Sequence, residues 1–282
     1  MNKVVVITGG AGGMGLATAK LVGSEGYHVV ISDVNEERLS SALTELKELG
    51  ISAEAAVCDI ADRKSVDALV DQSKKAGKLV GVVHSAGVSP QMGDAGFIAR
   101  INAIGTIYIT EAFLHEATEG FSLVNVASIA GHMMPGLTTP KRLFKLALTD
   151  LAAFERKLLR RVNFGPKKMR PGQAYSTSKS FVIWYSEKMA AVFGAKGARI
   201  VSVSPGTFDT AMGRLEEKSG SDKLVEFAAI KRYGRPEEVA ELLAFLATGK
   251  AGYISGTDIL IDGGTKAGLT LKGLLGLAFG KK

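Results

Sequence analysis

The 282-residue sequence contains one cysteine, Cys58, and only four histidines, which show no metal-ligand spacing. A single cysteine excludes a disulfide framework and a cysteine-based metal cluster, and it favours a reducing compartment. No apolar run approaches the roughly 18 residues that a membrane span needs. The run at residues 4–7 is also too short for a signal peptide. We therefore expect a cytoplasmic protein that uses neither a membrane nor a metal ion.

The formal net charge of +7 is concentrated in one segment. Residues 137–172 contain ten lysines and arginines but only Asp150 and Glu155 as acidic residues, a window of +8 that leaves −1 for the rest of the chain. A nucleic-acid partner is therefore not implied by the chain as a whole. Glycine is the other excess, with 34 copies or about 12%, against a usual value of about 7%.

Short apolar, β-branched runs alternate with longer stretches of helical period, which is typical of βαβ units and a parallel sheet covered on both faces. We expect one doubly wound α/β domain over residues 1–265, a helical insertion at 137–172 and a C-terminal tail at 266–282. The seven expected strands are residues 4–8, 28–33, 53–59, 80–85, 123–127, 199–204 and 258–261. Expected helices include residues 13–25, 35–49, 62–76 and 236–248.

The first expected strand runs into a glycine-rich turn, Thr8 to Gly15, and then into a helix. Glycines let a backbone approach a pyrophosphate, and a helix N-terminus supplies N–H donors to it, so this order predicts a dinucleotide site. Asp33 ends the second strand, where a carboxylate can accept both ribose hydroxyls and repel a 2′-phosphate. Residues 9–15 contain no basic side chain, and Val34 rather than an arginine follows Asp33. These features favour NAD over NADP.

A second constellation combines Tyr175, Lys179 and Ser128. A spacing of four places Tyr175 and Lys179 on one face of a helix. A phenol has an ordinary pKa near 10, and an adjacent ammonium stabilises its anion, so this pair is suited to proton transfer near neutral pH. A serine hydroxyl can hydrogen-bond a carbonyl oxygen as charge develops on it.

Taken in order, these motifs resemble the short-chain dehydrogenase/reductases, in their compact oxidoreductase branch. The resemblance covers residues 3–264 outside the insertion, and it implies a Rossmann fold. It is carried by Thr8-Gly9-x-x-x-Gly13-x-Gly15, Asp59, Ser85-Ala86-Gly87, Asn102, Ser128, Tyr175 with Lys179, Pro205-Gly206 with Thr210, and Ile261-Asp262-Gly263-Gly264.

The resemblance also implies roles for these residues. Tyr175 would transfer the proton, Ser128 would orient the carbonyl, Lys179 would bind ribose and stabilise the tyrosinate, and Asn102 would hold a water that links Lys179 to solvent. The implied cofactor contacts are Gly9, Gly13, Met14 and Gly15 at the pyrophosphate, Asp33 at the ribose, Asp59 at the adenine, Ala86 and Gly87 at the adenosine side, Tyr175 and Lys179, and Pro205, Gly206 and Thr210 at the nicotinamide.

The sequence departs from the family pattern at two places. His84-Ser85 replaces the usual asparagine pair before Ala-Gly, which predicts a looser strand-to-strand hydrogen bond. Ser128 and Tyr175 are 47 positions apart, where the family usually has about a dozen. The insertion resembles extra helices found in bacterial hydroxysteroid dehydrogenases and carbonyl reductases of the family.

These features predict an NAD(H)-dependent oxidoreductase that interconverts a secondary alcohol and a ketone. Met92, Met133, Met134, Phe208 and Met212 would suit a hydrophobic substrate of steroid or terpenoid type, and His132 is a further pocket candidate. Two alternatives remain: a 3-oxoacyl-thioester reductase, or a non-catalytic NAD-binding regulator. A homo-oligomer, either dimer or tetramer, is expected from the resemblance.

The insertion carries apolar residues at every third or fourth position. They are Leu143, Ala147, Leu151, Phe154, Leu158 and Val162. This pattern predicts one amphipathic helix of about 20 residues, either a lid or an oligomer contact, that buries its stripe against the parent domain or a sister subunit and leaves its basic face in solvent. Recruitment of an anionic substrate or a membrane by that basic face is the less favoured alternative. Trp184 and Cys58 are expected to be packing residues.

Overall fold

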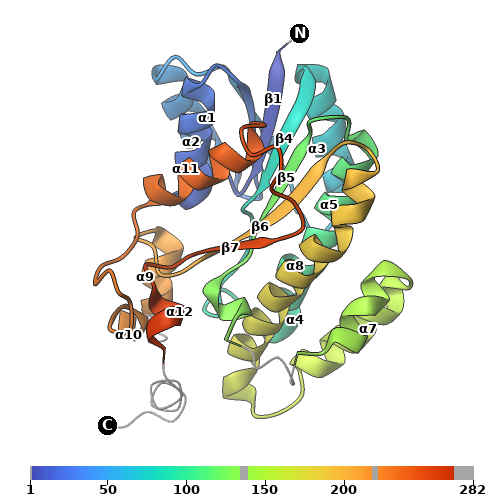
Figure 1. Cartoon of the computed structure of the whole chain (residues 1–282), viewed down its shortest axis with the longest axis vertical. Helices are drawn as coiled ribbons and strands as arrows, with labels where there is room; N and C mark the ends of the chain where they lie inside the picture. The colour runs from blue at the N-terminus through green and yellow to red at the C-terminus, as the bar shows by residue number, and fades with distance from the viewer. Residues whose placement is uncertain (1, 134–138, 218–221, 270–282) are drawn as a thin grey trace.

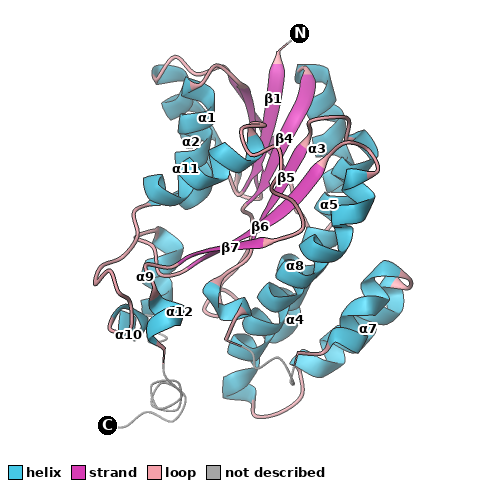
Figure 2. Ribbon diagram, viewed as in Figure 1, coloured by secondary structure: helices cyan, strands magenta, loops and turns pink. Residues whose placement is uncertain are grey.

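The computed structural model describes residues 2–133, 139–217 and 222–269, whose strands form one seven-stranded parallel sheet (Figures 1 and 2). The strand order is β3-β2-β1-β4-β5-β6-β7, so the chain winds outward in both directions from β1 and β4. The strands are β1 (Lys3–Thr8), β2 (His28–Asp33), β3 (Ala53–Val57), β4 (Lys78–His84), β5 (Ser122–Val126), β6 (Arg199–Pro205) and β7 (Asp258–Ile261). The expected doubly wound Rossmann fold is confirmed.

Helices cover both faces of the sheet, as Figure 1 shows. One face carries α1 (Gly13–Ser24), α2 (Glu36–Glu48) and α11 (Pro236–Ala247). The other carries α3 (Arg63–Ala76), α4 (Ala95–Ala99), α5 (Thr106–Glu116) and α8 (Arg170–Gly194). Three short helices, α9 (Ala211–Glu217), α10 (Asp222–Val225) and α12 (Thr265–Gly268), lie together near the C-terminus.

Successive side chains of a strand point to opposite faces of the sheet, so each strand contributes apolar residues to both cores. In β1, Val4 and Val6 belong to the core under α3, α5 and α8, whereas Val5 and Ile7 belong to the core under α1, α2 and α11. All four are fully buried. A strand that is buried on both faces must be apolar throughout, and this is the pattern that the sequence shows.

One expected strand is shorter in the structure than in the prediction. The strand expected at residues 53–59 ends at Val57. Cys58 still donates its N–H to Asp33 O (3.0 Å), but the Asp59 carboxylate accepts from Ala61 N (2.9 Å) and turns the chain toward α3. Local capping by the aspartate therefore ends the strand before the apolar pattern does.

Helices α4 and α5 form one continuous helix, Ala95–Glu116, interrupted by a π-helical segment, Arg100–Gly105. By length and composition this helix could span a membrane. Two-thirds of its most apolar window is buried inside the domain, so its composition is that of a core helix.

In the described part of the insertion, the stretch expected to form a single helix is broken into shorter helical pieces. They are α6 (Lys141–Phe144), a 3₁₀ turn (Lys145–Leu148) and α7 (Leu151–Val162). The break occurs because Asp150 caps α7, with its carboxylate accepting from Ala153 N at 2.9 Å. An aspartate satisfies a helix N-terminus better than it continues a helix, so capping outweighs the apolar periodicity.

The apolar stripe of α7 packs on the parent domain. Phe154, Leu158 and Val162 are buried against α4 and α8, and the Phe154 ring lies 4.8 Å from the Phe181 ring of α8. Phe144 packs on Phe181 and on Trp184, which is a packing residue as expected. On the surface, Arg100 and Glu155 form an ion pair (3.0 Å) between the π-helical segment and α7. The basic side chains Arg156, Lys157, Arg160 and Arg161 are exposed.

This packing predicts a large difference between two phenylalanine truncations. Phe154→Ala removes a fully buried ring and should lower the free energy of unfolding by about 3–5 kcal/mol. Phe164→Ala is the matched control, because that ring is 82% exposed, and should change it by less than about 0.5 kcal/mol. Urea denaturation measures both, and equal effects would contradict the packing of α7.

Candidate active site

A groove with a volume of about 300 Å³ runs along the carboxyl ends of the central strands. It is the edge of a doubly wound sheet at which ligands generally bind. Among the predicted cofactor residues, those that line the groove are Gly9, Gly13, Met14, Gly15, Asp33, Asp59, Ala86, Gly87, Tyr175, Lys179 and Thr210. Pro205, Gly206, Ser128 and Asn102 do not line it.

The glycine loop is shaped for close approach of a ligand to the backbone. Gly9 has φ +66°, and a Cβ on Gly15 would collide with the carbonyl oxygen of Gly9. Glycine is therefore required for α1 to begin directly against the loop. Helix α1 has no side-chain cap and no acidic residue in its first turn, so its N-terminal N–H groups suit a negatively charged group. These residues fit the pyrophosphate of a dinucleotide.

Asp33 and Arg38 both line the groove, at the end where the sequence places the ribose of a cofactor. Asp33 lies at the end of β2, where one carboxylate oxygen accepts from Asn35 N at 3.1 Å. Arg38 belongs to the first turn of α2, and a Cβ built on Gly12 would lie 2.9 Å from its Nη2 atom. In the sequence, residues 9–15 and position 34 lack a basic side chain, which favoured NAD. The fold nevertheless brings the guanidinium of Arg38 to this end of the groove.

Tyr175 and Lys179 lie one turn apart near the start of α8, as their spacing predicted. Lys179 Nζ is 5.9 Å from the centroid of the Tyr175 ring and donates to Val126 O at 2.9 Å. Lys179 is 6% exposed, so its positive charge lies in a weakly screening environment beside the phenol. The ammonium is therefore available to stabilise negative charge that develops on the phenol during proton transfer.

Ser128 reaches this region despite the 47-residue separation from Tyr175. It caps a 3₁₀ turn (Ile129–Gly131), and its hydroxyl oxygen accepts from Ala130 N at 3.1 Å. A Cβ on Gly131 would lie 2.8 Å from the carbonyl carbon of Lys179, so the turn packs directly on α8. The insertion, which lies between this turn and Tyr175 in the sequence, therefore does not separate the turn from α8.

Asn102 lies in the π-helical segment, Arg100–Gly105, and is buried. Its side-chain amide makes two hydrogen bonds to one residue: Oδ1 accepts from Val88 N and Nδ2 donates to Val88 O, each at 2.9 Å. The side chain is thereby engaged in positioning the loop after β4. The amide keeps one further N–H and one further oxygen lone pair, and the backbone carbonyl of Asn102 accepts from the Thr106 hydroxyl at 2.8 Å. The water-holding role that the family resemblance implies stays a prediction.

His84 does not loosen the sheet, contrary to the expectation from the sequence. Its ring is buried between two hydroxyls, with Nδ1 2.7 Å from Thr8 Oγ1 and Nε2 3.2 Å from Thr106 Oγ1. Burial and then the positive charge of Lys179 lower the pKa of His84 to about 3. The imidazole is therefore neutral throughout the physiological pH range.

The expected substrate-pocket residues are only partly brought together. Met92 and Met212 line the groove, together with Phe97 and Ile101. Met134 lies outside the described residues, and neither Met133 nor Phe208 lines the groove. His132 Nε2 is paired with Asp258 (2.7 Å), which ties the 3₁₀ turn to β7 and gives this histidine a structural contact instead of a pocket position.

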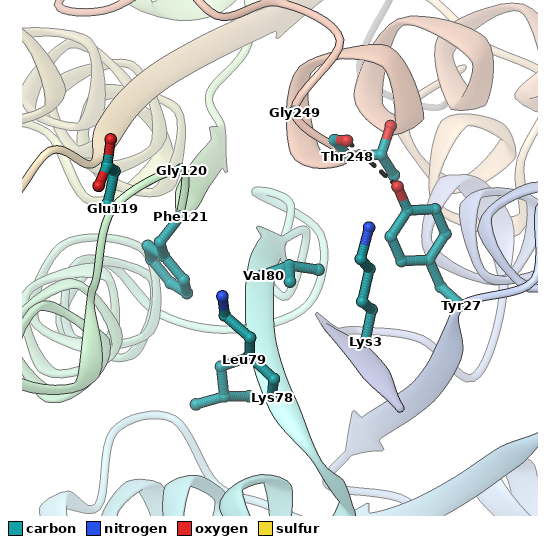
Figure 3. Close-up of a pocket in the computed structure, with 10 residues that line it drawn as sticks. All are labelled: Lys3, Tyr27, Lys78, Leu79, Val80, Glu119, Gly120, Phe121, Thr248 and Gly249. Atoms are coloured by element: carbon teal, nitrogen blue, oxygen red, sulfur yellow. Dashed lines mark hydrogen bonds between the residues drawn. The ribbon is translucent and has the colours of Figure 1, made fainter. Parts of the chain in front are cut away.

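A second cavity, of about 220 Å³, lies at the opposite, amino-terminal edge of the sheet (Figure 3). Lys3, Lys78 and Glu119 line it, and the Tyr27 hydroxyl donates to Thr248 O at 3.2 Å. It contains neither the glycine loop nor the Tyr175–Lys179 pair. In the described part of the chain, no group of three or more His, Cys, Asp or Glu side chains is placed to hold a metal ion.

Comparison with known proteins identifies the family of the chain. A family model described as short chain dehydrogenase matches residues 3–140, and one described as Enoyl-(Acyl carrier protein) reductase matches residues 164–266. A short-chain dehydrogenase/reductase from Alternaria brassicicola, bsc3, is 30% identical and covers 96% of this chain and 98% of its own length. The chain belongs to the short-chain dehydrogenase/reductase family.

Two further relatives illustrate the range of this family. A 3beta-hydroxysteroid dehydrogenase 2 from Eggerthella lenta is 26% identical and covers 94% of this chain and 95% of its own. A short chain dehydrogenase from Burkholderia cenocepacia, solved in complex with NADP, is 26% identical, has a TM-score of 0.75 and covers 94% and 98%. The two family models leave residues 141–163 of this short-chain dehydrogenase/reductase unmatched, a gap that contains α6 and α7.

The low pKa of His84 predicts a specific loss of stability in acid. The pKa is about 3 in the folded chain and near 6.5 in the unfolded chain, so the imidazole takes up a proton on unfolding. Its contribution to stability is complete well above pH 6.5, falls by about 1.4 kcal/mol for each pH unit between pH 6.5 and about pH 3, and changes no further below that. Urea unfolding measures how far the free energy of unfolding falls between pH 6.5 and pH 4.5. This fall should be smaller in His84→Gln than in the unmodified protein by about 2–3 kcal/mol. An equal drop in both proteins would show that His84 is not neutral in the fold.

Proposed function

We propose that this protein is an NAD(H)-dependent oxidoreductase that interconverts a secondary alcohol and a ketone in one catalytic domain over residues 1–265. The observation that carries the proposal is the buried ammonium of Lys179 beside the Tyr175 ring, at the rim of a groove that a dinucleotide fits. Ser128, Tyr175, Lys179 and Asn102 are the proposed catalytic residues.

Tyr175 would handle the proton of the reaction. In the reducing direction its hydroxyl donates to the carbonyl oxygen, and in the oxidising direction its anion accepts the alcohol proton. Lys179, held by Val126 O, lowers the cost of forming the tyrosinate. The nicotinamide cofactor, when bound, supplies or accepts the hydride. Ser128 would hydrogen-bond the carbonyl oxygen as negative charge develops on it.

The cofactor residues are proposed in the same way. Gly9, Gly13, Met14 and Gly15 would contact the pyrophosphate, Asp33 the ribose, Asp59 the adenine, and Pro205, Gly206 and Thr210 the nicotinamide. Asp33 favours NAD because its carboxylate accepts ribose hydroxyls and repels a 2′-phosphate. Arg38 opposes this preference, since a guanidinium attracts a phosphate.

A hydrophobic substrate of steroid or terpenoid type is proposed from the lining of the groove beyond Lys179. Met92, Phe97, Ile101 and Met212 supply apolar and flexible surface there. The hydroxysteroid dehydrogenase of Eggerthella lenta supports this substrate class. A panel of steroid, terpenoid and aliphatic secondary alcohols, followed by NADH absorbance, tests it.

An acyl-thioester reductase is the second candidate. Residues 164–266 match a family model described as Enoyl-(Acyl carrier protein) reductase, and the exposed basic residues of α7 suit a phosphate-bearing carrier. A 3-oxoacyl thioester added to the same panel separates the two candidates.

The homo-oligomer and the cytoplasmic location stay predictions. Light scattering tests the oligomeric state.

Removing the Tyr175 hydroxyl should abolish turnover but not cofactor binding. Tyr175→Phe is expected to lower kcat by about 100-fold or more, because it deletes the proton and keeps the ring. NADH affinity, measured by fluorescence, should stay within about twofold. Tyr185→Phe makes the same change in the same helix outside the groove and should retain activity. Substantial activity in Tyr175→Phe would refute the proton-transfer role.

Asp33 and Arg38 should have opposite effects on cofactor choice. Asp33→Ala is expected to raise KM for NAD by about 10- to 100-fold through loss of charged hydrogen bonds, while turnover with NADP improves because Arg38 remains. Arg38→Ala should leave KM for NAD within about threefold and weaken any use of NADP. If both variants raised KM for NAD to the same extent, Asp33 would not be the residue that determines the choice of cofactor.

A further inference from the structure

His84 is fixed by hydrogen bonds whose directions the structure determines. The Thr106 hydroxyl donates to the carbonyl oxygen of Asn102 (2.8 Å), which can only accept. The single hydroxyl proton of Thr106 is therefore used, and its oxygen can only accept from His84 Nε2, 3.2 Å away. The neutral ring thus carries its proton on Nε2.

The same reasoning fixes the other side of the ring. Since Nε2 bears the proton, Nδ1 of His84 is an acceptor and takes the Thr8 hydroxyl proton at 2.7 Å. The Thr8 oxygen in turn accepts from Ala86 N at 3.3 Å. The result is one ordered chain that runs from Ala86 N–H through Thr8, His84 and Thr106 to Asn102 O.

This chain joins the end of β1 and the loop after β4 to the π-helical segment. A second attachment lies at Val88, four residues after His84, where the Asn102 side chain makes two hydrogen bonds to the Val88 backbone. Between the two attachments, a Cβ on Gly87 would lie 3.1 Å from Asn102 Oδ1 and 3.4 Å from Lys179 Nζ. The surroundings of the Lys179 ammonium therefore depend on how residues 84–88 are held against the π-helical segment.

We propose that His84 is a positioning residue for proton transfer, because its ordered chain through Thr106 holds the Asn102 carbonyl and the loop beside Lys179 in register. The inference rests on the proposed oxidoreductase function, and it adds a role for His84 and Thr106. Neither side chain lines the groove, so the role is exerted through Asn102 and Lys179.

Substitution of Thr106 tests the chain with a matched control in the same helix. Thr106→Val removes the hydroxyl that His84 and Asn102 share, and Thr106→Ser restores it. Thr110 lies one turn further along α5 and is also buried, but its hydroxyl has no hydrogen-bond partner among the described residues. Thr110→Val is therefore the same chemical change without a link to break.

The expected result is a loss confined to turnover. Thr106→Val should lower kcat by about tenfold or more while the NADH dissociation constant, measured by fluorescence, stays within about threefold. Thr106→Ser should recover most of kcat, and Thr110→Val should match the unmodified protein. Thermal unfolding checks that each variant is folded, and His84→Gln replaces Thr106→Val as the test if the latter is not.

Two results would overturn the proposal. Equal kcat in Thr106→Val and Thr110→Val would show that the chain has no part in turnover. An equal loss in kcat and in NADH affinity would show that Thr106 merely shapes the groove. Failure of the proposed function is distinguishable, because the unmodified protein would then bind NADH but turn over no alcohol, ketone or thioester.

Discussion

The buried ammonium of Lys179 is the constraint on which the rest of the site depends. A charge that is 6% exposed is costly unless polar groups compensate for it. The carbonyl of Val126, at the end of β5, accepts one of its hydrogen bonds. The same charge helps to keep His84 neutral, and this neutrality lets the ring accept on one side and donate on the other.

The parallel sheet brings these groups together. Because all strands run the same way, Thr8, His84 and Val126 end at one edge of the sheet, although the sequence separates them widely. The π-helical segment then turns Asn102 toward the loop after β4. In the described part of the insertion, α7 packs on α4 and α8 through Phe154 and Leu158, which are separate from the groups named here.

The sequence allowed prediction of the features that local spacing or strong composition controls. The strands were recognisable because burial on both faces requires uninterrupted apolar runs, and the spacing of Tyr175 and Lys179 required one face of one helix. Arg38 and His84 were missed as site residues because their roles arise from contacts between distant segments. One signal was available for each: Arg38 lies five residues after Asp33, near the start of the helix that was expected there, and His84 is a polar residue that follows the apolar residues Val82 and Val83. The break at Asp150 was missed because capping competes with apolar periodicity, and only the fold decides which one prevails.

In our account, a nicotinamide cofactor bound in the groove transfers a hydride to a carbonyl carbon that lies beside Tyr175 and Lys179. The most direct measurement is mass spectrometry of the alcohol formed from a ketone that the protein turns over, with NADH deuterated separately at each of the two C4 positions. Our account predicts that one of the two labelled cofactors places one deuterium on the carbinol carbon of the product. An alcohol that carries deuterium from neither cofactor would contradict it.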